Sequence, residues 1–353
     1  MSGFSDIIGQ NQMKEHLRHA LRTGRISHAY LFTGAEGMGK KMVAGTFART
    51  ILCENRQERD GMPEACGTCP ACVMTQAGTH PDLRILTHEK KTYGIDEVRT
   101  QFVQDIVLKP MKGEHRVYII PEADRMTAAV QNAILKTLEE PPAYAVILLL
   151  TERPDALLAT ILSRTVQLPL KPVSDKEIEE LLKSRYRIPD YLAHECAAVA
   201  AGNVGLAIGY SGSDRLFRMV EQTAGLLSGL DRLMTADMME RLSEILLDPD
   251  PEAAEKKKKT ALKDAGDREL ERFLDLLMIL NRDAMVYKAT GDPEKLVFTK
   301  QLAYDREAAK KSWFMLDQNN RRIEEARRRL QSNVNTDLTL ELLLLGMKGN
   351  LDE

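Results

Sequence analysis

The stretch from residue 29 to residue 52 constrains the fold more than any other part of the sequence. An apolar run at 29–32 leads into a glycine-rich turn, and apolar residues at helical spacing predict an amphipathic helix after Lys40. Gly34, Gly39 and Lys40 fit the phosphate-loop pattern GxxxxGK[ST]. The sequence therefore predicts the strand, turn and helix that this pattern requires.

One position of this loop departs from the pattern. Lys41 stands where a serine or threonine would bind Mg²⁺, and a protonated lysine has no lone pair to offer a metal. The candidate nucleotide-binding residues of this degenerate loop are Gly34, Gly37, Gly39 and Lys40. Backbone amides at a helix N-terminus bind phosphate without a metal. Two alternatives stay open: the loop holds ATP or ADP without Mg²⁺, or it only preserves the turn.

A second metal-ligand position is also altered. Hydrolases with such a loop carry a carboxylate at the end of a neighbouring strand. The strand predicted at 116–120 is followed by Pro121, which cannot ligate Mg²⁺. Asp124 is an alternative ligand, but we expect it to cap a helix. Without Mg²⁺ the transferred phosphate loses charge neutralisation. The sequence therefore predicts a chain without ATPase activity of its own.

The remaining patterns predict an α/β domain followed by helices. A strand at 145–150 follows a helix at 127–140, and this order predicts a parallel sheet covered on both faces. The helix has an apolar face, and we expect Gln131 to belong to its polar face, which is either solvated or a subunit interface. Short helical patterns broken by glycines fill 174–212.

From about residue 213 the pattern is one of long amphipathic helices. The predicted helices are 216–246, 270–287, 308–330 and 338–347. The segment 248–267 between the first two is acidic, then basic, and poor in apolar residues, which is typical of an exposed linker.

The cysteines are spaced like metal ligands. Three follow a C-x2-C-x2-C pattern and a fourth lies upstream, so that four thiolates can complete a tetrahedral Zn²⁺ shell. The candidate ligands are Cys53, Cys66, Cys69 and Cys72. With all four positions filled by protein, the zinc would be structural. His80 is an alternative zinc ligand, but we expect it to be a loop or capping residue, and we expect Cys196 to be a small core residue.

Composition sets the wider limits. The 353 residues are 43% hydrophobic and 29% charged, which predicts a soluble, helix-rich protein of two or three domains. The formal net charge of −3 gives no global nucleic-acid signature. The sequence lacks a signal-peptide pattern and an apolar run of membrane-spanning length, so we expect a cytoplasmic protein without membrane contacts.

Six stretches resemble the clamp-loader subunits of bacterial DNA polymerase III, through about residue 212. They are DIIGQ (6–10), HAYLFTG (28–34), CGTCPAC (66–72), GTHPD (78–82), NAILKTLEEPP (132–142) and LLATILSRT (157–165). The resemblance implies an AAA+ fold in three domains. These are a RecA-like α/β domain at 1–168 with a zinc insert at about 53–75, a helical lid at 169–212, and an all-α collar at 213–353 that oligomerises.

Within this family the chain looks closest to the subunit that does not hydrolyse ATP. The hydrolysing gamma/tau subunit would show GKT or GKS and a strand-end Asp-Glu, where this chain has Lys41 and Pro121. The lid arginine of the active members is replaced by Gly205. Thr151 falls at the family's polar sensor position, and we interpret it as a strand-terminating threonine.

Arg164 is the remaining candidate for a catalytic role. It matches the arginine of the family's Ser-Arg-Cys motif, with Thr165 in place of the cysteine, and the resemblance implies that it acts in trans on a neighbouring subunit's ATP. A guanidinium matches phosphate oxygens as a planar fork. Without the resemblance, a surface or ion-paired arginine is the simpler interpretation.

The leading hypothesis is a non-hydrolysing subunit of the clamp loader within the DNA polymerase III holoenzyme, a nucleotidyltransferase complex. The resemblance implies gamma/tau and delta subunits as partners, and the sliding clamp and primed DNA as partners through the complex. The alternatives are an autonomous AAA+ ATPase with an unusual metal site and a gamma/tau-like ATPase. A zinc-dependent nucleic-acid-binding module at 53–85 is a further alternative, for which that segment holds only a few basic residues.

Overall fold

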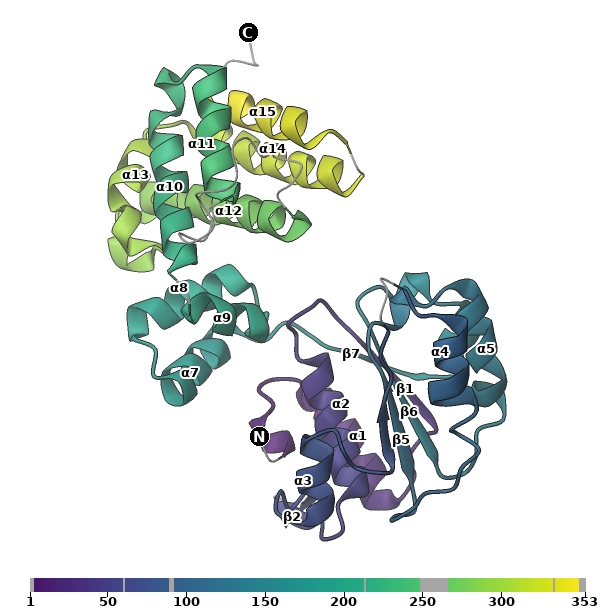
Figure 1. Cartoon of the computed structure of the whole chain (residues 1–353). Helices are drawn as coiled ribbons and strands as arrows, with labels where there is room; N and C mark the ends of the chain where they lie inside the picture. The colour runs from purple at the N-terminus through teal and green to yellow at the C-terminus, as the bar shows by residue number, and fades with distance from the viewer. Residues whose placement is uncertain are drawn as a thin grey trace, which may run out of the picture. The chain divides into compact units, whose positions relative to one another are not determined.

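The computed structural model describes most of the chain, in six segments. These are residues 3–59, 61–88, 92–212, 214–247, 266–332 and 334–348. Internal contacts divide the chain into two compact units. Figure 1 labels the helices and strands of both units. The first unit holds residues 1–187 and 200–208, and the second holds 188–199 and 209–353. Most of the expected linker at 248–267 lies outside the described residues.

The first unit is built on a parallel five-stranded sheet, as the sequence predicts. In spatial order its strands are β4 (Leu83–Ile85), β5 (Arg116–Ile120), β6 (Ala145–Thr151), β1 (Ala29–Thr33) and β7 (Val166–Pro169). Every neighbouring pair is parallel. Strands β4 and β7 escape sequence prediction because three and four residues are too short to show a period.

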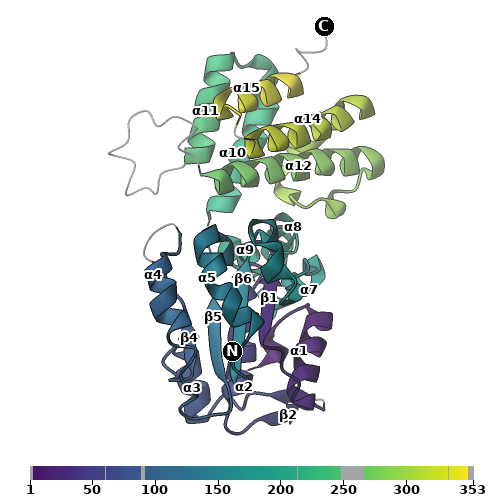
Figure 2. The ribbon, with the colours of Figure 1, turned by 90° about the vertical axis from the view of Figure 1, so that its right-hand side faces the viewer.

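Helices cover both faces of this sheet (Figure 2). On one face, α1 (Asn11–Thr23) and α2 (Lys40–Leu52) pack on a core that includes Tyr30 and Leu148. On the other face, α4 (Ile95–Val98), a π-helical turn (Arg99–Val103), α5 (Ala128–Glu139) and α6 (Ala159–Leu162) enclose a second core. Because strand side chains alternate between faces, residues such as Leu31 and Leu149 belong to that second core.

The polar face expected for α5 is only partly solvated. Gln131 is buried, and its amide donates hydrogen bonds to the carbonyls of Met126 and Ala156. Its side-chain oxygen accepts the backbone N–H of Leu158. The expectation of a solvated Gln131 is therefore wrong. The side chain satisfies backbone groups of the loop that leads into α6, which a helical period does not reveal.

Short elements complete the first unit. The hairpin β2 (Gln57–Arg59) and β3 (Met62–Glu64) and helix α3 (Pro70–Gln76) follow α2. Helix α7 (Asp175–Tyr186) follows its N-cap Ser174, which forms a capping box with Glu177.

The boundary between the units falls within the region of the expected lid. Helix α8 (Asp190–Ala200) has all but its last residue in the second unit, and the contact boundary runs through α9 (Val204–Ser211). The three-domain division at residues 168 and 212 stays a prediction.

The described part of the second unit is helical. Its main helices are α10 (Arg215–Gly229), α11 (Thr235–Leu247), α12 (Asp267–Thr290), α13 (Leu302–Ala308), α14 (Trp313–Gln331) and α15 (Thr336–Met347). Among the described residues, no helix combines the length and the apolar character needed to cross a membrane.

Two of the predicted long helices differ from the observed ones. The helix expected at 216–246 is divided in two and first stops at Gly229, whose low helix propensity favours an end. The helix expected at 308–330 begins later, at Trp313, where the Ser312 side chain caps α14 by accepting the N–H of Met315. A continuous apolar pattern does not show where such a helix begins or breaks.

Candidate functional site

The phosphate loop has the expected shape. It connects the end of β1 to the start of α2, and Gly34, Gly37 and Gly39 have φ values of 153°, 84° and 96°. These left-handed conformations favour glycine. The Lys40 ammonium donates to the carbonyls of Gly34 and Ala35, so it is engaged with the loop itself. Burial lowers the pKa of Lys40.

The start of α9 lies directly against this loop. Asn203 donates its side-chain amide to the Glu36 carbonyl at 2.6 Å, and the Gly205 N–H donates to the Gly37 carbonyl at 3.0 Å. A Cβ on Gly205 would come within 2.6 Å of that same carbonyl oxygen. Position 205, where active relatives are expected to carry an arginine, therefore has no room for a side chain in this conformation.

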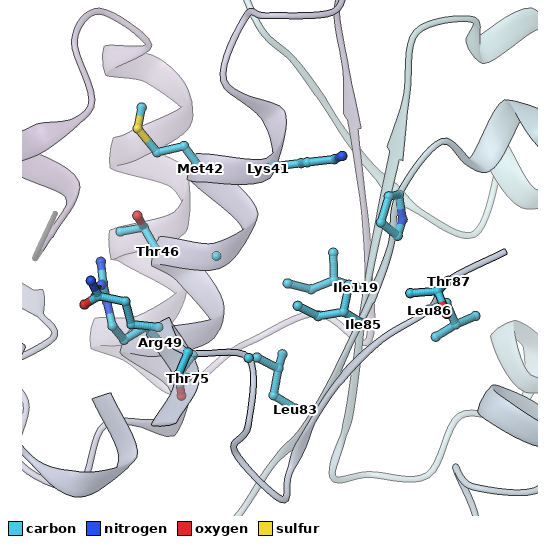
Figure 3. Close-up of a pocket in the computed structure, with 15 residues that line it drawn as sticks. Lys41, Met42, Thr46, Arg49, Thr75, Leu83, Ile85, Leu86, Thr87 and Ile119 are labelled. Atoms are coloured by element: carbon cyan, nitrogen blue, oxygen red, sulfur yellow. Dashed lines mark hydrogen bonds between the residues drawn. The ribbon is translucent and has the colours of Figure 1, made fainter. Parts of the chain in front are cut away.

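The two altered metal-ligand positions lie on one cavity. Lys41 and Pro121 both line a space of about 740 Å³ in the first unit, and Figure 3 shows the Lys41 side chain extending from α2 toward the strands. The next acid, Glu122, is engaged with Arg125 at 2.9 Å and with His88 at 3.3 Å. The site therefore offers neither a hydroxyl nor a strand-end carboxylate at these two positions.

Asp124 and Thr151 form a pair that the sequence does not reveal. Thr151 is buried at the end of β6, as expected for a strand-terminating residue, and its hydroxyl donates to Asp124 at 2.8 Å. The same carboxylate oxygen accepts the N–H of Glu152. The expectation that Asp124 caps a helix is wrong. Asp124 fixes the end of β6 instead, because the chain brings its carboxylate to that strand from 27 residues away.

The four candidate zinc ligands come together. Cys53 follows the last turn of α2, Cys66 follows β3, Cys69 is the N-cap of α3, and Cys72 lies in the first turn of α3. Their sulfur atoms all lie within 4.8 Å of one another, and three sulfur–sulfur distances are 3.6 to 3.9 Å. Zn–S bonds of about 2.3 Å imply tetrahedral edges of roughly 3.8 Å. The donor set therefore fits a structural zinc ion.

Backbone groups around the cluster favour thiolates. The N–H groups of Cys66, Cys69 and Cys72 lie 3.3 to 3.4 Å from the sulfurs of the preceding cysteines. Backbone N–H groups of Thr68 and Cys69 lower the pKa of Cys66 to about 6, whereas burial raises the pKa of Cys53.

His80 and Cys196 stand apart from this cluster. His80 is buried in the loop before β4, and its Nδ1 accepts the N–H of Asp82 at 3.1 Å, in agreement with a loop residue. Cys196 is fully buried in α8, in agreement with a core residue.

Arg164 lies on the surface of the first unit, just after α6. Its side chain is 34% exposed, pairs with Glu139 of α5 at 2.9 Å, and donates to the Thr160 carbonyl at 3.0 Å. The Thr165 hydroxyl donates to the Ile161 carbonyl, so the threonine helps to close the end of α6. The guanidinium is therefore held by local contacts and still reaches solvent.

Comparisons with known proteins agree with the resemblance. A family model described as "DNA polymerase III, delta subunit" matches residues 9–174. DNA polymerase III subunit delta' of Bacillus subtilis is 29% identical over 340 residues, which cover 95% of each chain. The chain is thus similar to the delta-prime subunit of DNA polymerase III over almost its whole length. The parallel sheet with its glycine loop after β1 agrees with the α/β architecture that this resemblance implies.

The chain is also similar to other clamp-loader subunits. DNA polymerase III subunit tau of Salmonella typhimurium is 34% identical over 197 residues, which are 56% of this chain and 29% of that protein. This chain thus spans less than a third of the length of this tau relative. A solved gamma subunit-related protein from Thermotoga maritima aligns over 95% of this chain and 99% of its own, with 19% identity and a TM-score of 0.42.

Proposed function

We propose that this chain is a non-hydrolysing subunit of a DNA polymerase III clamp loader. In this role it supports the loading of a sliding clamp onto primed DNA by an assembly with gamma/tau and delta subunits. The observation that carries the proposal is the contact between the phosphate loop and the start of α9, where Gly205 and Asn203 bind loop carbonyls.

This contact disfavours nucleotide binding. A phosphate loop binds its ligand through free backbone N–H groups and a lysine ammonium directed at the phosphates. Here the Lys40 ammonium is bound to carbonyls of its own loop, and Asn203 holds the Glu36 carbonyl. The Lys40 ammonium would have to leave these carbonyls before it could bind phosphates.

The altered metal-ligand positions disfavour hydrolysis even if a nucleotide enters. Mg²⁺ neutralises developing charge in phosphoryl transfer, an effect worth several kcal/mol. Lys41 brings a positive charge to the position of a metal-binding hydroxyl, and Pro121 removes a carboxylate. The nearby Glu122 is held by Arg125 and His88. The site therefore supports a platform role rather than an autonomous ATPase.

Arg164 would then act on a neighbouring subunit's ATP. Its guanidinium is partly exposed at the end of α6 and is always charged. The pair with Glu139 orients the side chain, and a surface ion pair of this kind costs little to break. An arginine held this way can exchange its carboxylate partner for phosphate oxygens when subunits assemble.

Zinc would hold the segment after α2 in place. The four cysteines connect the end of α2 with the hairpin β2–β3 and with α3, and a bound Zn²⁺ would fix these elements by coordinating four thiolates. In this proposal the metal has a structural role and takes no part in hydrolysis.

The test is nucleotide binding and hydrolysis by the purified full-length chain. We expect no Mg²⁺-dependent ATP hydrolysis above background and no saturable binding of a fluorescent ATP analogue at micromolar concentration. The same preparation should stimulate clamp loading when it is added to gamma/tau and delta subunits. Steady hydrolysis that Lys40→Ala abolishes would instead support an autonomous ATPase and overturn the proposal.

A further inference from the structure

The N-terminal segment at 3–10 connects two parts of the first unit that lie far apart in the sequence (Figure 1). The backbone N–H of Phe4 donates to the carboxylate of Glu64, the last residue of β3, at 2.8 Å. Two residues later, Asp6 pairs with Arg185 of α7 at 2.9 Å. The segment therefore contacts the hairpin β2–β3 on one side and α7 on the other.

Glu64 is the buried member of this connection. It is only 2% exposed, and both of its carboxylate oxygens have partners, since Oε2 accepts the Phe4 N–H and Oε1 pairs with Arg18 of α1. The Arg18 guanidinium also lies 5.4 Å from the ring centroid of Phe4, which is itself fully buried. A buried carboxylate is stable only with such partners. Glu64 therefore holds β3 against both the N-terminal segment and α1.

The hairpin that carries Glu64 is small. Its two strands have three residues each, and all three residues of β2 are exposed. A two-stranded hairpin of this kind is marginally stable by itself in water. Contacts outside the hairpin must therefore determine where β3 lies.

The candidate zinc site lies directly after this strand. Cys66 follows Glu64 by two residues, and its sulfur lies 3.6 Å from that of Cys53 at the end of α2. A Zn²⁺ ion bound by the four thiolates would fix the Cys66 backbone relative to α2 and α3. Glu64 and the metal thus anchor the same end of β3, one to the N-terminal segment and α1, the other to α2 and α3.

We propose that Glu64 is a positioning residue for the zinc site and couples zinc binding to docking of the N-terminal segment. Zinc holds β3 where Glu64 binds Phe4 and Arg18, and these contacts in turn hold Cys66 where it binds the metal. Two binding events that favour one arrangement strengthen each other by the same factor. The proposal rests on the structural zinc ion of the proposed function and gives that ion a second role, at the N-terminus.

The first measurement is the Zn²⁺ affinity of the full-length chain, by competition with a chromophoric chelator of known affinity. Glu64→Gln keeps an acceptor oxygen but removes the charge that pairs with Arg18. It should weaken zinc binding about tenfold, because losing a residue that orients a ligand costs about 10–100-fold in metal affinity. Glu58→Gln removes an equal charge from the exposed strand of the same hairpin and should leave the affinity unchanged.

A variant in the N-terminal segment tests the coupling from its other end. A Cβ on Gly3 would overlap the Glu64 carboxylate, so Gly3→Ala should displace that carboxylate without altering a cysteine. The zinc affinity should fall, as it does in Glu64→Gln. Gly45→Ala is the matched control, because a Cβ at this position of α2 meets nothing within 4 Å.

Hydrogen exchange of the wild-type chain measures the reciprocal effect. The N–H of Phe4 is bonded to Glu64, and the N–H groups of Asp6 and Ile7 are bonded within the segment. Removal of zinc by a chelator should speed exchange of the amides at 4–7 by about fivefold or more. Amides of the central strand β6 should not change. In Glu64→Gln, the amides at 4–7 should exchange fast with or without zinc.

Circular dichroism and thermal unfolding establish that each variant is folded, and the exchange of the wild-type chain needs no variant. The proposal is overturned if zinc binds but the amides at 4–7 exchange at the same rate with and without it. It is also overturned if both Glu64→Gln and Gly3→Ala keep the wild-type zinc affinity, or if zinc removal speeds exchange in β6 equally. A folded wild-type chain that binds no zinc would overturn the zinc site itself, which distinguishes that failure from a failure of the coupling.

Discussion

Gly205 lies so close to Gly37 that a Cβ at position 205 would come within 2.6 Å of the Gly37 carbonyl oxygen and 2.8 Å of its Cα. Backbone atoms cannot move aside as the end of a flexible side chain can. The contact therefore makes position 205 a sensitive reporter of whether α9 rests on the phosphate loop in solution.

Gly205→Ala should destabilise the first unit by about 1–3 kcal/mol, because the methyl group forces two backbone segments apart. The measurement is the free energy of unfolding in urea. Gly209→Ala, in the same helix, is the matched control, since a Cβ there meets nothing within 4 Å. Alanine at 209 should be neutral or stabilising. Equal effects of the two substitutions would show that α9 does not rest on the loop.

Lys41→Thr alone should not create an ATPase. The hydroxyl restores one metal-ligand position, but Pro121 still provides no carboxylate and α9 still contacts the loop. Phosphate release by the purified variant, with and without Mg²⁺, checks this expectation. Robust Mg²⁺-dependent turnover would show that Pro121 does not stand at the metal-ligand position.

The purified chain should contain about one equivalent of Zn²⁺. Cys69→Ser should lower the zinc content and the thermal stability together, because a hydroxyl is a poor ligand for zinc in a thiolate site. Cys196→Ala, which changes a cysteine far from the cluster in sequence, should leave the zinc content unchanged. A folded wild-type protein without zinc by elemental analysis would contradict this prediction.

Arg164→Ala should leave folding and assembly intact and lower the DNA-stimulated ATPase of the reconstituted complex. Arginine fingers contribute about 10³–10⁵ in rate, but only the active site served by this subunit is affected, so a partial loss is expected. Arg164→Lys should rescue poorly, because an ammonium lacks the planar fork.

Glu139→Gln separates an arginine finger from a structural ion pair. This substitution breaks the pair with Arg164 at 2.9 Å while it keeps the guanidinium. If Arg164 acts in trans, Glu139→Gln should retain the ATPase of the complex that Arg164→Ala loses. If the two variants lose the same activity, Arg164 serves only the ion pair.

Asp305 should make the second unit less stable as the pH rises. Its carboxylate is fully buried in α13 without a hydrogen-bond partner among the described residues, and burial, with Asp283 nearby, raises its pKa from 3.8 to about 7. Below pH 4 the carboxyl is neutral in both folded and unfolded states. Between pH 4 and 7 only the folded state keeps the proton, so stability falls with pH and levels off above pH 7.

Asp305→Asn should therefore raise the free energy of unfolding by roughly 1–3 kcal/mol at pH 8. The gain should shrink toward pH 4. Asp317→Asn, at an exposed carboxylate of the same unit, is the control and should show a much smaller pH-dependent change. Urea unfolding from pH 4 to 9 gives the comparison. A gain that does not vary with pH would show that Asp305 keeps an ordinary pKa.

The local part of the site could be predicted from the sequence. The strand, glycine turn and helix around Lys40 follow from a contiguous pattern, and the spacing of Cys66, Cys69 and Cys72 is itself a ligand geometry. The sequence also places Pro121 directly after its strand, as observed, because the apolar run before it is short and well bounded. Each of these signals depends on residues that are close together in the chain.

The contacts between distant residues could not be predicted. Asn203 forms a hydrogen bond with Glu36, 167 residues away in the sequence, and Asp124 forms one with Thr151, 27 residues away. Neither contact can be detected from the periodicity of apolar residues or from the spacing of a motif. The sequence misplaces Gln131 because a polar residue on a helix is usually solvated, whereas here loop backbone groups satisfy it.

The strand order of the sheet also bears on how the chain folds as it is synthesised. Strand β1, which carries the phosphate loop, pairs only with β6 and β7, whose residues begin at 145 and 166. Until those residues have left the ribosome, both hydrogen-bonding edges of β1 lack a partner, although α1 and α2 can already form. Unpaired apolar strands are prone to wrong pairing. Nascent chains that end before residue 145 should therefore depend on chaperones, and chains that extend beyond residue 169 should not.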